Sequence, residues 1–126
     1  MPISFPKLEK ILLTVQKPGR YVGGEFNLIM KDSPLIRMAI SYPDLYEVGM
    51  SNNGIKIIYE AANSIDDIAC ERVFSVDLDF EKSLRSNDIP LYTLESFTPL
   101  RELDIIGFNI SHELLYTNIL QILDLG

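Results

Sequence analysis

The sequence has one cysteine, one histidine and few basic residues. The single cysteine, Cys70, can form neither a disulfide within the chain nor a thiolate cluster. A lone histidine, His112, beside no cysteine cluster gives no expectation of a metal site built by this chain alone. Eleven Lys and Arg against eighteen Asp and Glu give a net charge of −7. Because a protein surface that binds nucleic acid needs basic residues, we expect no nucleic-acid partner.

Long apolar runs are also missing. No stretch approaches the roughly 20 apolar residues of a membrane-spanning helix, and the first ten residues lack the apolar core of a secretion signal. The 126 residues, 47% hydrophobic and 23% charged, have the length and composition of one globular domain. We therefore expect a cytoplasmic domain that has no contact with a membrane.

The pattern of apolar residues predicts alternating helices and strands. Predicted helices lie between Ser4 and Lys17, at 52–63 with Ser51 as the cap, after Asp77 or Asp79, and at 113–125; predicted strands lie at 36–41, 70–76, 90–94 and 103–110. Alternation with short connections is typical of an α/β fold with a mainly parallel sheet, right-handed crossovers and flanking helices. The apolar run at 103–110 predicts a central strand covered on both faces.

The last predicted helix, 113–125, is apolar on nearly every side, and the chain stops where another strand is expected. We therefore expect a sheet that is truncated before its last strands, or one that a partner chain completes. We divide the chain into an N-terminal helix with a glycine-rich loop, residues 1–35, and an α/β domain, residues 36–126, which together form one structural unit.

The glycine-rich loop, KPGRYVGGEFN, is a candidate anion site. Backbone N–H groups freed by glycine, together with basic side chains, can cradle an anion; the candidates are Lys17, Arg20, Gly23 and Gly24. The loop lacks the G-K-[ST] ending of a P-loop and follows a helix instead of a strand. The alternative is a surface loop that packs Tyr21 and Phe26 onto the edge of the sheet.

Asp44, Tyr46 and Gly49 form a D-x-Y-x-x-G motif at the exit of the first predicted strand, where α/β sheets usually bind ligands. The motif resembles the D-x-H-x-x-G of cobalamin-binding domains, whose histidine ligates cobalt. Tyr46 takes the place of that histidine, and a neutral phenol with a pKa of about 10 is a weak ligand. The alternative is an ordinary strand-to-helix turn with a capping acid and a turn glycine.

Ser111 and His112 follow the 103–110 strand. His112 is a candidate ligand or acid–base group, or else a capping or exposed residue, and Ser111 lacks the G-x-S-x-G setting of a hydrolase. We assign no catalytic residue and no metal ligand. Further candidates are three carboxylates, for which the alternative is an ordinary solvated position on an acidic surface: Glu25, Glu47 and Glu113. Three aromatic residues line either a pocket or the core: Tyr92, Phe97 and Tyr116.

Four stretches together, over about residues 10–126, resemble a known family: KPGRYVGGEFN, SYPDLYEVGMSNNGIKIIYEAAN, ERVFSVDLDFEKSLRSNDIPLYTLES and LDIIGFNISHELLYTNILQILDL. They are similar to the N-terminal region of a family of uncharacterised radical S-adenosylmethionine proteins, in which a cobalamin-binding-like domain precedes the radical barrel. The resemblance implies a Rossmann-like, flavodoxin-type fold for 36–126. It also implies that the domain presents a corrinoid, or a substrate, to the radical centre.

The resemblance implies a corrinoid bound without an axial histidine, near Asp44, Tyr46, Gly49, Ser51, Ser111 and His112. The family's iron–sulfur cluster is held by a C-x-x-x-C-x-x-C motif in the barrel, so S-adenosylmethionine and the cluster belong to a downstream domain that acts as partner in cis. The chain alone is then not catalytic.

Two other functions stay open. A cofactor-free scaffold would dock the barrel or another protein, or self-associate, through the glycine-rich loop, the sheet edge or the last helix. A phosphate or nucleotide binder would use Lys17, Arg20, Gly23 and Gly24.

Overall fold

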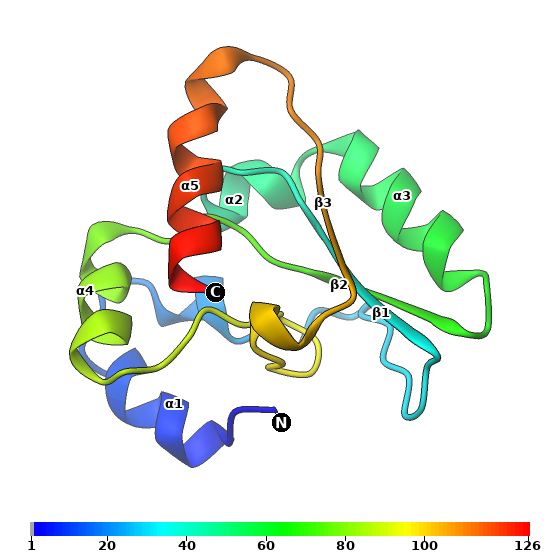
Figure 1. Ribbon diagram of the computed structural model, residues 1–126. Helices are drawn as coiled ribbons and strands as arrows, with labels where there is room; N and C mark the ends of the chain where they lie inside the picture. The colour runs from blue at the N-terminus through cyan, green and yellow to red at the C-terminus, as the bar shows by residue number, and fades with distance from the viewer. Residues whose placement is uncertain (1) are drawn as a thin grey trace.

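The computed structural model describes residues 2–126 and contains a three-stranded parallel sheet with helices on both faces (Figure 1). The strands are β1 (Ile36–Ser41), β2 (Ile68–Arg72) and β3 (Ile105–Phe108), in the order β2-β1-β3. The helices are α1 (Phe5–Leu12), α2 (Tyr46–Met50), α3 (Asn53–Asn63), α4 (Leu78–Ser86) and α5 (Tyr116–Leu125), with short 3₁₀ helices η1 (Pro18–Tyr21), η2 (Leu100–Glu102) and η3 (Glu113–Leu115). The predicted α/β fold with a parallel sheet is confirmed.

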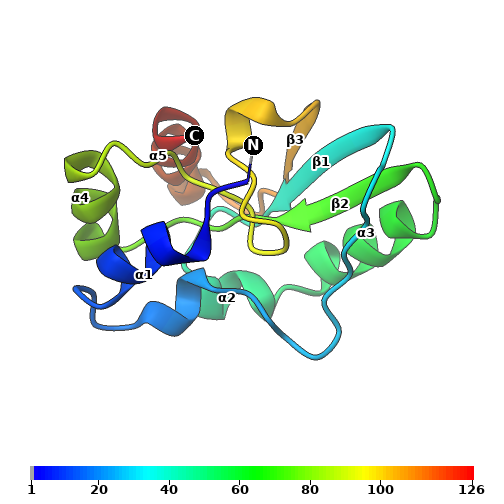
Figure 2. The ribbon, with the colours of Figure 1, turned by 90° about the horizontal axis from the view of Figure 1, so that it is seen from below.

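Alternating side chains of β1 divide the core into two parts. Ile40 packs in a cluster with Ile55 of α3, whereas Ala39 packs in a cluster with Phe80 of α4 and Ile122 of α5. Figure 2 shows α2 and α3 on one side of the sheet and α5 on the other. No helix within residues 2–126 is long and apolar enough to cross a membrane.

Two helices, α3 and α4, begin at residues whose side chains cap them. Asp77 caps α4 by accepting a bond from the Leu78 N–H at 2.8 Å, as predicted. The cap of α3 is Asn52, whose Oδ1 accepts from the Ile55 N–H at 3.0 Å. The prediction of Ser51 as that cap was wrong, because its hydroxyl donates instead to the Glu47 carbonyl in the turn before.

The predicted strand at 90–94 does not join the sheet. Residues 91–94 are buried, but the chain turns back at Thr93 and Thr98, where the Thr93 N–H donates to the Thr98 carbonyl at 3.0 Å. Only an isolated antiparallel bridge joins Tyr92 to Pro99. Burial and alternation are the same in such a turned-back segment as in a strand, so the apolar pattern does not distinguish the two.

The prediction that 103–110 forms a central strand was also wrong. β3 pairs on one side with β1, and its other side is an edge of the sheet. Ile105 and Ile110 are therefore exposed. The central strand is β1, whose bounds, Ile36–Ser41, are the predicted ones.

Candidate functional site

The order β2-β1-β3 reverses direction at the carboxyl ends of β1 and β3, and we refer to the surface between these two ends as the crevice. The connection through α3 leaves β1 in one direction, and the chain that returns through α4 reaches β3 on the other side of β1. Ligands of open α/β sheets bind at this kind of reversal. The segment after β1, residues 42–45, and the segment after β3, residues 109–112, form its two sides.

Direct hydrogen bonds join the two sides of this crevice. The Tyr42 and Ser111 hydroxyls lie 2.6 Å apart, and the Asn109 amide donates to Asn52 Oδ1 at 3.0 Å. The predicted residue Ser111 is thus brought to the loop after β1. His112 is exposed at the start of η3.

Ser41, the last residue of β1, supplies an unusual polar group at the same end of the sheet. Its side chain is fully buried, and its Oγ has no hydrogen-bond partner, alone among the buried side-chain polar atoms of residues 2–126. Ser41 pairs with Phe108 of β3 in the register of the sheet. Buried polar groups are nearly always satisfied, so the unpaired Ser41 hydroxyl is an exception in this fold.

The D-x-Y-x-x-G loop turns β1 into α2. The Asp44 carboxylate accepts a bond from the next backbone N–H, that of Leu45, at 2.7 Å. Gly49 is buried, and a Cβ there would overlap the ring of Phe74. The glycine of the motif is therefore required by packing against Phe74, whatever the crevice binds.

The phenol of Tyr46 is already engaged with the glycine-rich loop. It donates to Glu25 Oε1 at 2.5 Å, and its ring meets Phe74 edge-on with centroids 5.9 Å apart. Burial, together with the hydrogen bond to Glu25, raises the pKa of Tyr46 to about 12. A phenol that stays neutral and bonded in this way is not free to act as a metal ligand.

Behind Tyr46 lies a buried charge network around Arg72. Its guanidinium contacts Glu95 Oε2 at 2.6 Å and Glu25 Oε2 at 2.8 Å, and it lies over the ring of Tyr59, whose hydroxyl donates to Glu95 at 2.8 Å. The side chains of Arg72 and Glu95 are only 5% and 0% exposed. The apolar pattern did not predict this network; its one signal in the sequence was a charged pair, Glu71-Arg72, in an otherwise apolar strand.

The two carboxyls of the network have pKa values shifted in opposite directions. Burial raises the pKa of Glu95 above its ordinary value, although Arg72 opposes the shift. Burial acts in the same direction on Glu25, but hydrogen bonds from Tyr46 and Arg72 outweigh it and lower the pKa of Glu25. The carboxylate form of Glu25 is therefore part of the folded structure.

This shift predicts an acid-dependent contribution to stability. A carboxyl with a lowered pKa in the folded state stabilises the fold above its ordinary value of 4.5, and the contribution is lost as the pH falls below that value. We expect Glu25→Gln to lower the free energy of unfolding near neutral pH and to lose this effect as the pH falls below 4.5 and through the lowered pKa of Glu25. Urea unfolding across this range measures it. Glu113→Gln at an exposed position is the control, and a deficit of Glu25→Gln that does not change with pH would contradict the prediction.

The glycine-rich loop does not present its arginine to solvent. Arg20 Nε contacts Glu47 at 2.7 Å and Nη1 contacts Asp77 at 3.1 Å, with the guanidinium side chain 10% exposed. Gly23 and Gly24 both have positive φ, 62° and 79°. Lys17 is exposed. Anion binding here stays a prediction, and an anion would have to compete with two carboxylates for Arg20.

The other candidates do not gather at the crevice. Tyr92 and Phe97 pack edge-on at 5.5 Å in or against the core. Tyr116 is exposed on α5 and Glu113 on η3. Glu47 contacts Arg20, whereas Glu25 contacts Tyr46 and Arg72.

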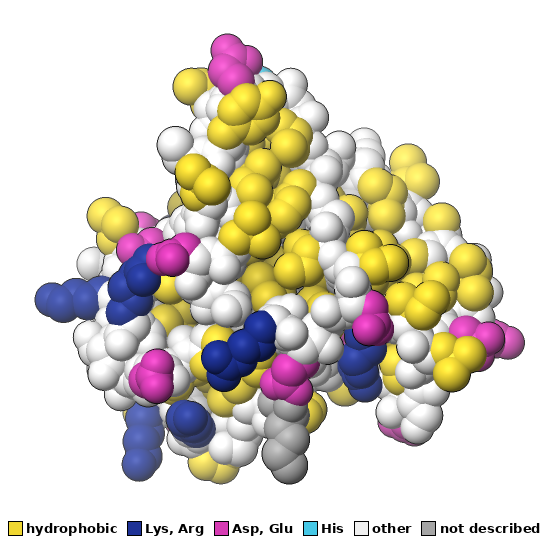
Figure 3. Space-filling model, in the orientation of Figure 1, with side chains coloured by type: hydrophobic (Ala, Val, Ile, Leu, Met, Phe, Trp, Pro, Cys, Tyr) yellow, Lys and Arg dark blue, Asp and Glu magenta, His cyan; other side chains and the backbone are white. Residues whose placement is uncertain are grey.

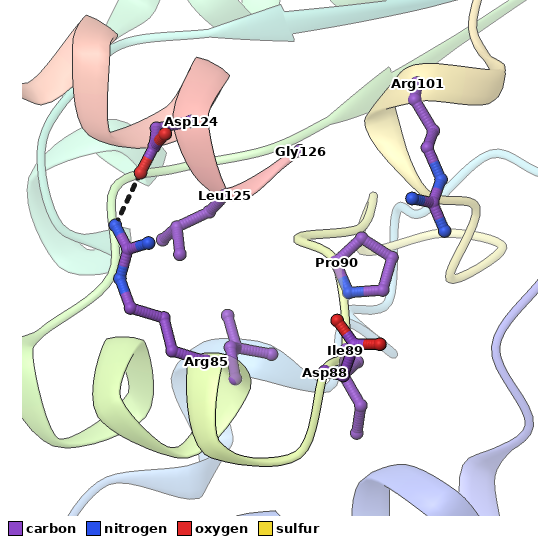
Figure 4. A pocket seen from close by; sticks show the side chains of 9 residues that line it. Arg85, Asp88, Ile89, Pro90, Arg101, Asp124, Leu125 and Gly126 are labelled. Carbon is purple, nitrogen blue, oxygen red and sulfur yellow. Dashed lines mark hydrogen bonds and ion pairs between the residues drawn. The ribbon is translucent and has the colours of Figure 1, made fainter.

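A cavity of about 380 Å³ lies where α4 and α5 end, close to η2 (Figure 4). Arg85 and Asp124 meet in it at 2.7 Å, while Asp88 and Arg101 form other parts of its wall. None of the residues predicted for a site lines it. Within residues 2–126 no group of three or more His, Cys, Asp or Glu could hold a metal ion.

The fold defines the chain as an α/β domain whose strand order reverses at the carboxyl ends of β1 and β3. Residues 54–126, from α3 to α5, match the family model described as radical SAM proteins, N-terminal. The match covers more than half of the chain, and the chain belongs to this family. The predicted N-terminal domain of a radical SAM protein is thus confirmed. Searches of the curated proteins and of the solved structures found no match.

Proposed function

We propose that this chain is a cobalamin-binding-like module of a radical SAM protein, which holds a corrinoid or a substrate at the crevice between β1 and β3. The observation that carries the proposal is the reversal of strand order at the carboxyl ends of β1 and β3, with Asp44 and Ser111 on its two sides. Family membership supplies the context, since the matched model describes the N-terminal part of radical SAM proteins.

In this proposal the corrinoid takes no axial ligand from this chain. Tyr46 donates to Glu25 and stays neutral, and the Asp44 carboxylate is bonded to the backbone of its own turn. Asp44 and Ser111 would then hold the ring and its tail by contact and hydrogen bonding. When bound, a corrinoid supplies a cobalt centre for methyl or radical chemistry.

The module carries no catalytic centre of its own in this proposal. Cys70 is fully buried, and burial raises the pKa of its thiol to about 12, so it is a poor cluster ligand. S-adenosylmethionine and an iron–sulfur cluster would be bound by a radical barrel elsewhere in the same polypeptide. That barrel is the partner of this module.

A cofactor-free scaffold is the second candidate function, and one observation favours it. The hydrogen bonds from Tyr42 to Ser111 and from Asn109 to Asn52 already bridge the crevice. A ligand would have to break or bypass them. In this function the module docks the barrel by protein contacts alone.

Titration with hydroxocobalamin separates these two functions. We expect a change in the visible spectrum and corrinoid that stays with the protein through desalting. Tyr46→Phe should leave the spectrum of the bound corrinoid unchanged, because the phenol is not a ligand. Ser111→Leu should weaken retention, whereas Ser86→Leu, at an exposed position on α4, should not.

Two outcomes would contradict the expectation. Loss of all corrinoid on desalting would leave the cofactor-free scaffold as the function. A spectrum of imidazole-ligated cobalt that disappears in His112→Ala would overturn the mode without an axial histidine.

A further inference from the structure

The outer edge of β3 has backbone groups without a strand to pair with. The Asp104 N–H, just before β3, donates to the Arg37 carbonyl of β1 at 2.9 Å. Because successive N–H groups of a strand point to opposite sides, those of Ile105 and Gly107 point away from β1. Within residues 2–126, no strand lies on that side.

The edge of β2, in contrast, is closed by the chain itself. The backbone groups on this edge belong to Ile68, Cys70 and Arg72. The Ile68 carbonyl, and both the N–H and the carbonyl of the other two, form hydrogen bonds with groups outside the sheet. Lys31 Nζ donates to the Ile68 carbonyl. The Asn63 amide bonds both the N–H and the carbonyl of Cys70, each at 2.9 Å.

Arg72 ends the same edge and is satisfied in the same manner. Its N–H donates to Glu95 Oε1 at 2.8 Å, and its carbonyl accepts from the Leu94 N–H at 2.9 Å. Proteins cover sheet edges that would otherwise pair with other chains. One edge of this sheet is therefore capped by named side chains, and the other is not.

The uncapped edge continues into an exposed apolar surface. Large apolar side chains of β3, its C-terminal extension and α5 face water here: Ile105, Ile110, Tyr116, Leu120 and Leu123. Figure 3 shows hydrophobic side chains running down α5 and across to β3. A patch of this kind marks an interaction surface.

The position of α5 indicates which kind of element covers that surface. α5 packs with α4 on one face of the sheet, and α4 lies in the connection that leads from β2 past β1 to β3. Right-handed crossovers on the same face advance the sheet in the same direction. A connection through α5 therefore leads to a strand on the far side of β3.

The end of α5 fits such a strand. Gly126 lies against Leu100 of η2, where a Cβ would come within 2.8 Å of the Leu100 Cβ. The Leu125 carbonyl accepts from the Leu91 N–H at 2.8 Å. α5 thus returns the chain to the end of the sheet at which β3 begins, which is where a strand parallel to β3 has to start.

We propose that the free edge of β3 and the exposed face of α5 form the docking surface for one further parallel strand, apolar on both faces and supplied by the same polypeptide. Its backbone pairs with Ile105 and Gly107, and its side chains cover Leu120, Leu123 and Tyr116. The proposal is independent of corrinoid binding, because the crevice lies between β1 and β3 and not at this edge.

Hydrogen exchange tests the proposal by comparing the polypeptide as its gene encodes it with residues 1–126 alone. We expect the amides of Ile105 and Gly107 to exchange at least about 100-fold more slowly in the gene-encoded polypeptide. Equal exchange in the two proteins overturns the proposal, and so does a gene that ends at Gly126. Protection in residues 1–126 that grows with concentration, together with a dimer by sedimentation, would show a second copy as the occupant.

A matched pair of variants checks the side chains. Leu120 on α5 and Ile57 on α3 are both 67% exposed. Leu120→Glu should lower the Tm of the gene-encoded polypeptide and leave that of residues 1–126 unchanged, because only the former covers this position. Ile57→Glu should leave the difference between the two proteins unaltered. Equal effects of Leu120→Glu in both proteins would count against the docking surface.

Discussion

Replacing Arg72 with methionine is expected to lower the free energy of unfolding by about 3–5 kcal/mol, the cost of leaving a buried charge without its partner. Glu95 is fully buried and accepts from the Arg72 backbone, the guanidinium and Tyr59. Without the guanidinium its charge has no counter-ion, and Glu25 loses its ion pair as well. Urea unfolding followed by circular dichroism measures the loss.

Two further variants show that the loss comes from burial of the pair. Arg85→Met removes an ion pair with Asp124 whose side chains are 50% and 65% exposed, and exposed pairs contribute less than about 1 kcal/mol. The double variant Arg72→Met with Glu95→Met should recover part of the loss, because it removes both buried charges. A loss in Arg72→Met no larger than that in Arg85→Met would show that the network is not energetically coupled.

Gly23→Ala is expected to lower the free energy of unfolding by at least about 2 kcal/mol. The left-handed backbone, with φ of +62°, costs a non-glycine residue about 1–2 kcal/mol. A Cβ would also overlap the carbonyl oxygen of Leu94, in the backbone segment that supplies Glu95 and caps Arg72. Thermal and urea unfolding of the variant measure the cost.

Gly24→Ala is the matched control for this prediction. Gly24 also has positive φ, +79°, but a Cβ there would meet no atom within 4 Å. The Gly24→Ala variant should therefore lose only the part of the free energy of unfolding that the positive φ costs, without the part caused by overlap. Equal losses in the two variants would mean that contact with Leu94 contributes nothing and that conformational strain alone explains both glycines.

The sequence predicted local elements well where one face of each element is buried. β1 forms at 36–41 and α3 at 53–63, close to the predicted 52–63, because their apolar spacing decides both the type of element and the face that packs. The D-x-Y-x-x-G loop was likewise placed correctly at the carboxyl end of β1. These features depend on residues only a few positions apart.

Features that depend on distant pairs could not be predicted. Tyr46 meets Glu25 across 21 positions, and the Arg72 N–H meets Glu95 across 23, and no periodicity reports such contacts. The edge position of β3 depends on which strands the crossovers place beside it. An apolar run looks the same at an edge awaiting a partner as in the middle of a sheet.

The closed edge at β2 limits how this domain can assemble with copies of itself. Lys31, Asn63 and Glu95 occupy the backbone groups that another chain would use, so residues 2–126 without the proposed strand have one free sheet edge, at β3. When two copies of residues 1–126 pair through that edge, neither copy has a free sheet edge left. Edge-to-edge association therefore ends at a pair and does not propagate into a fibre.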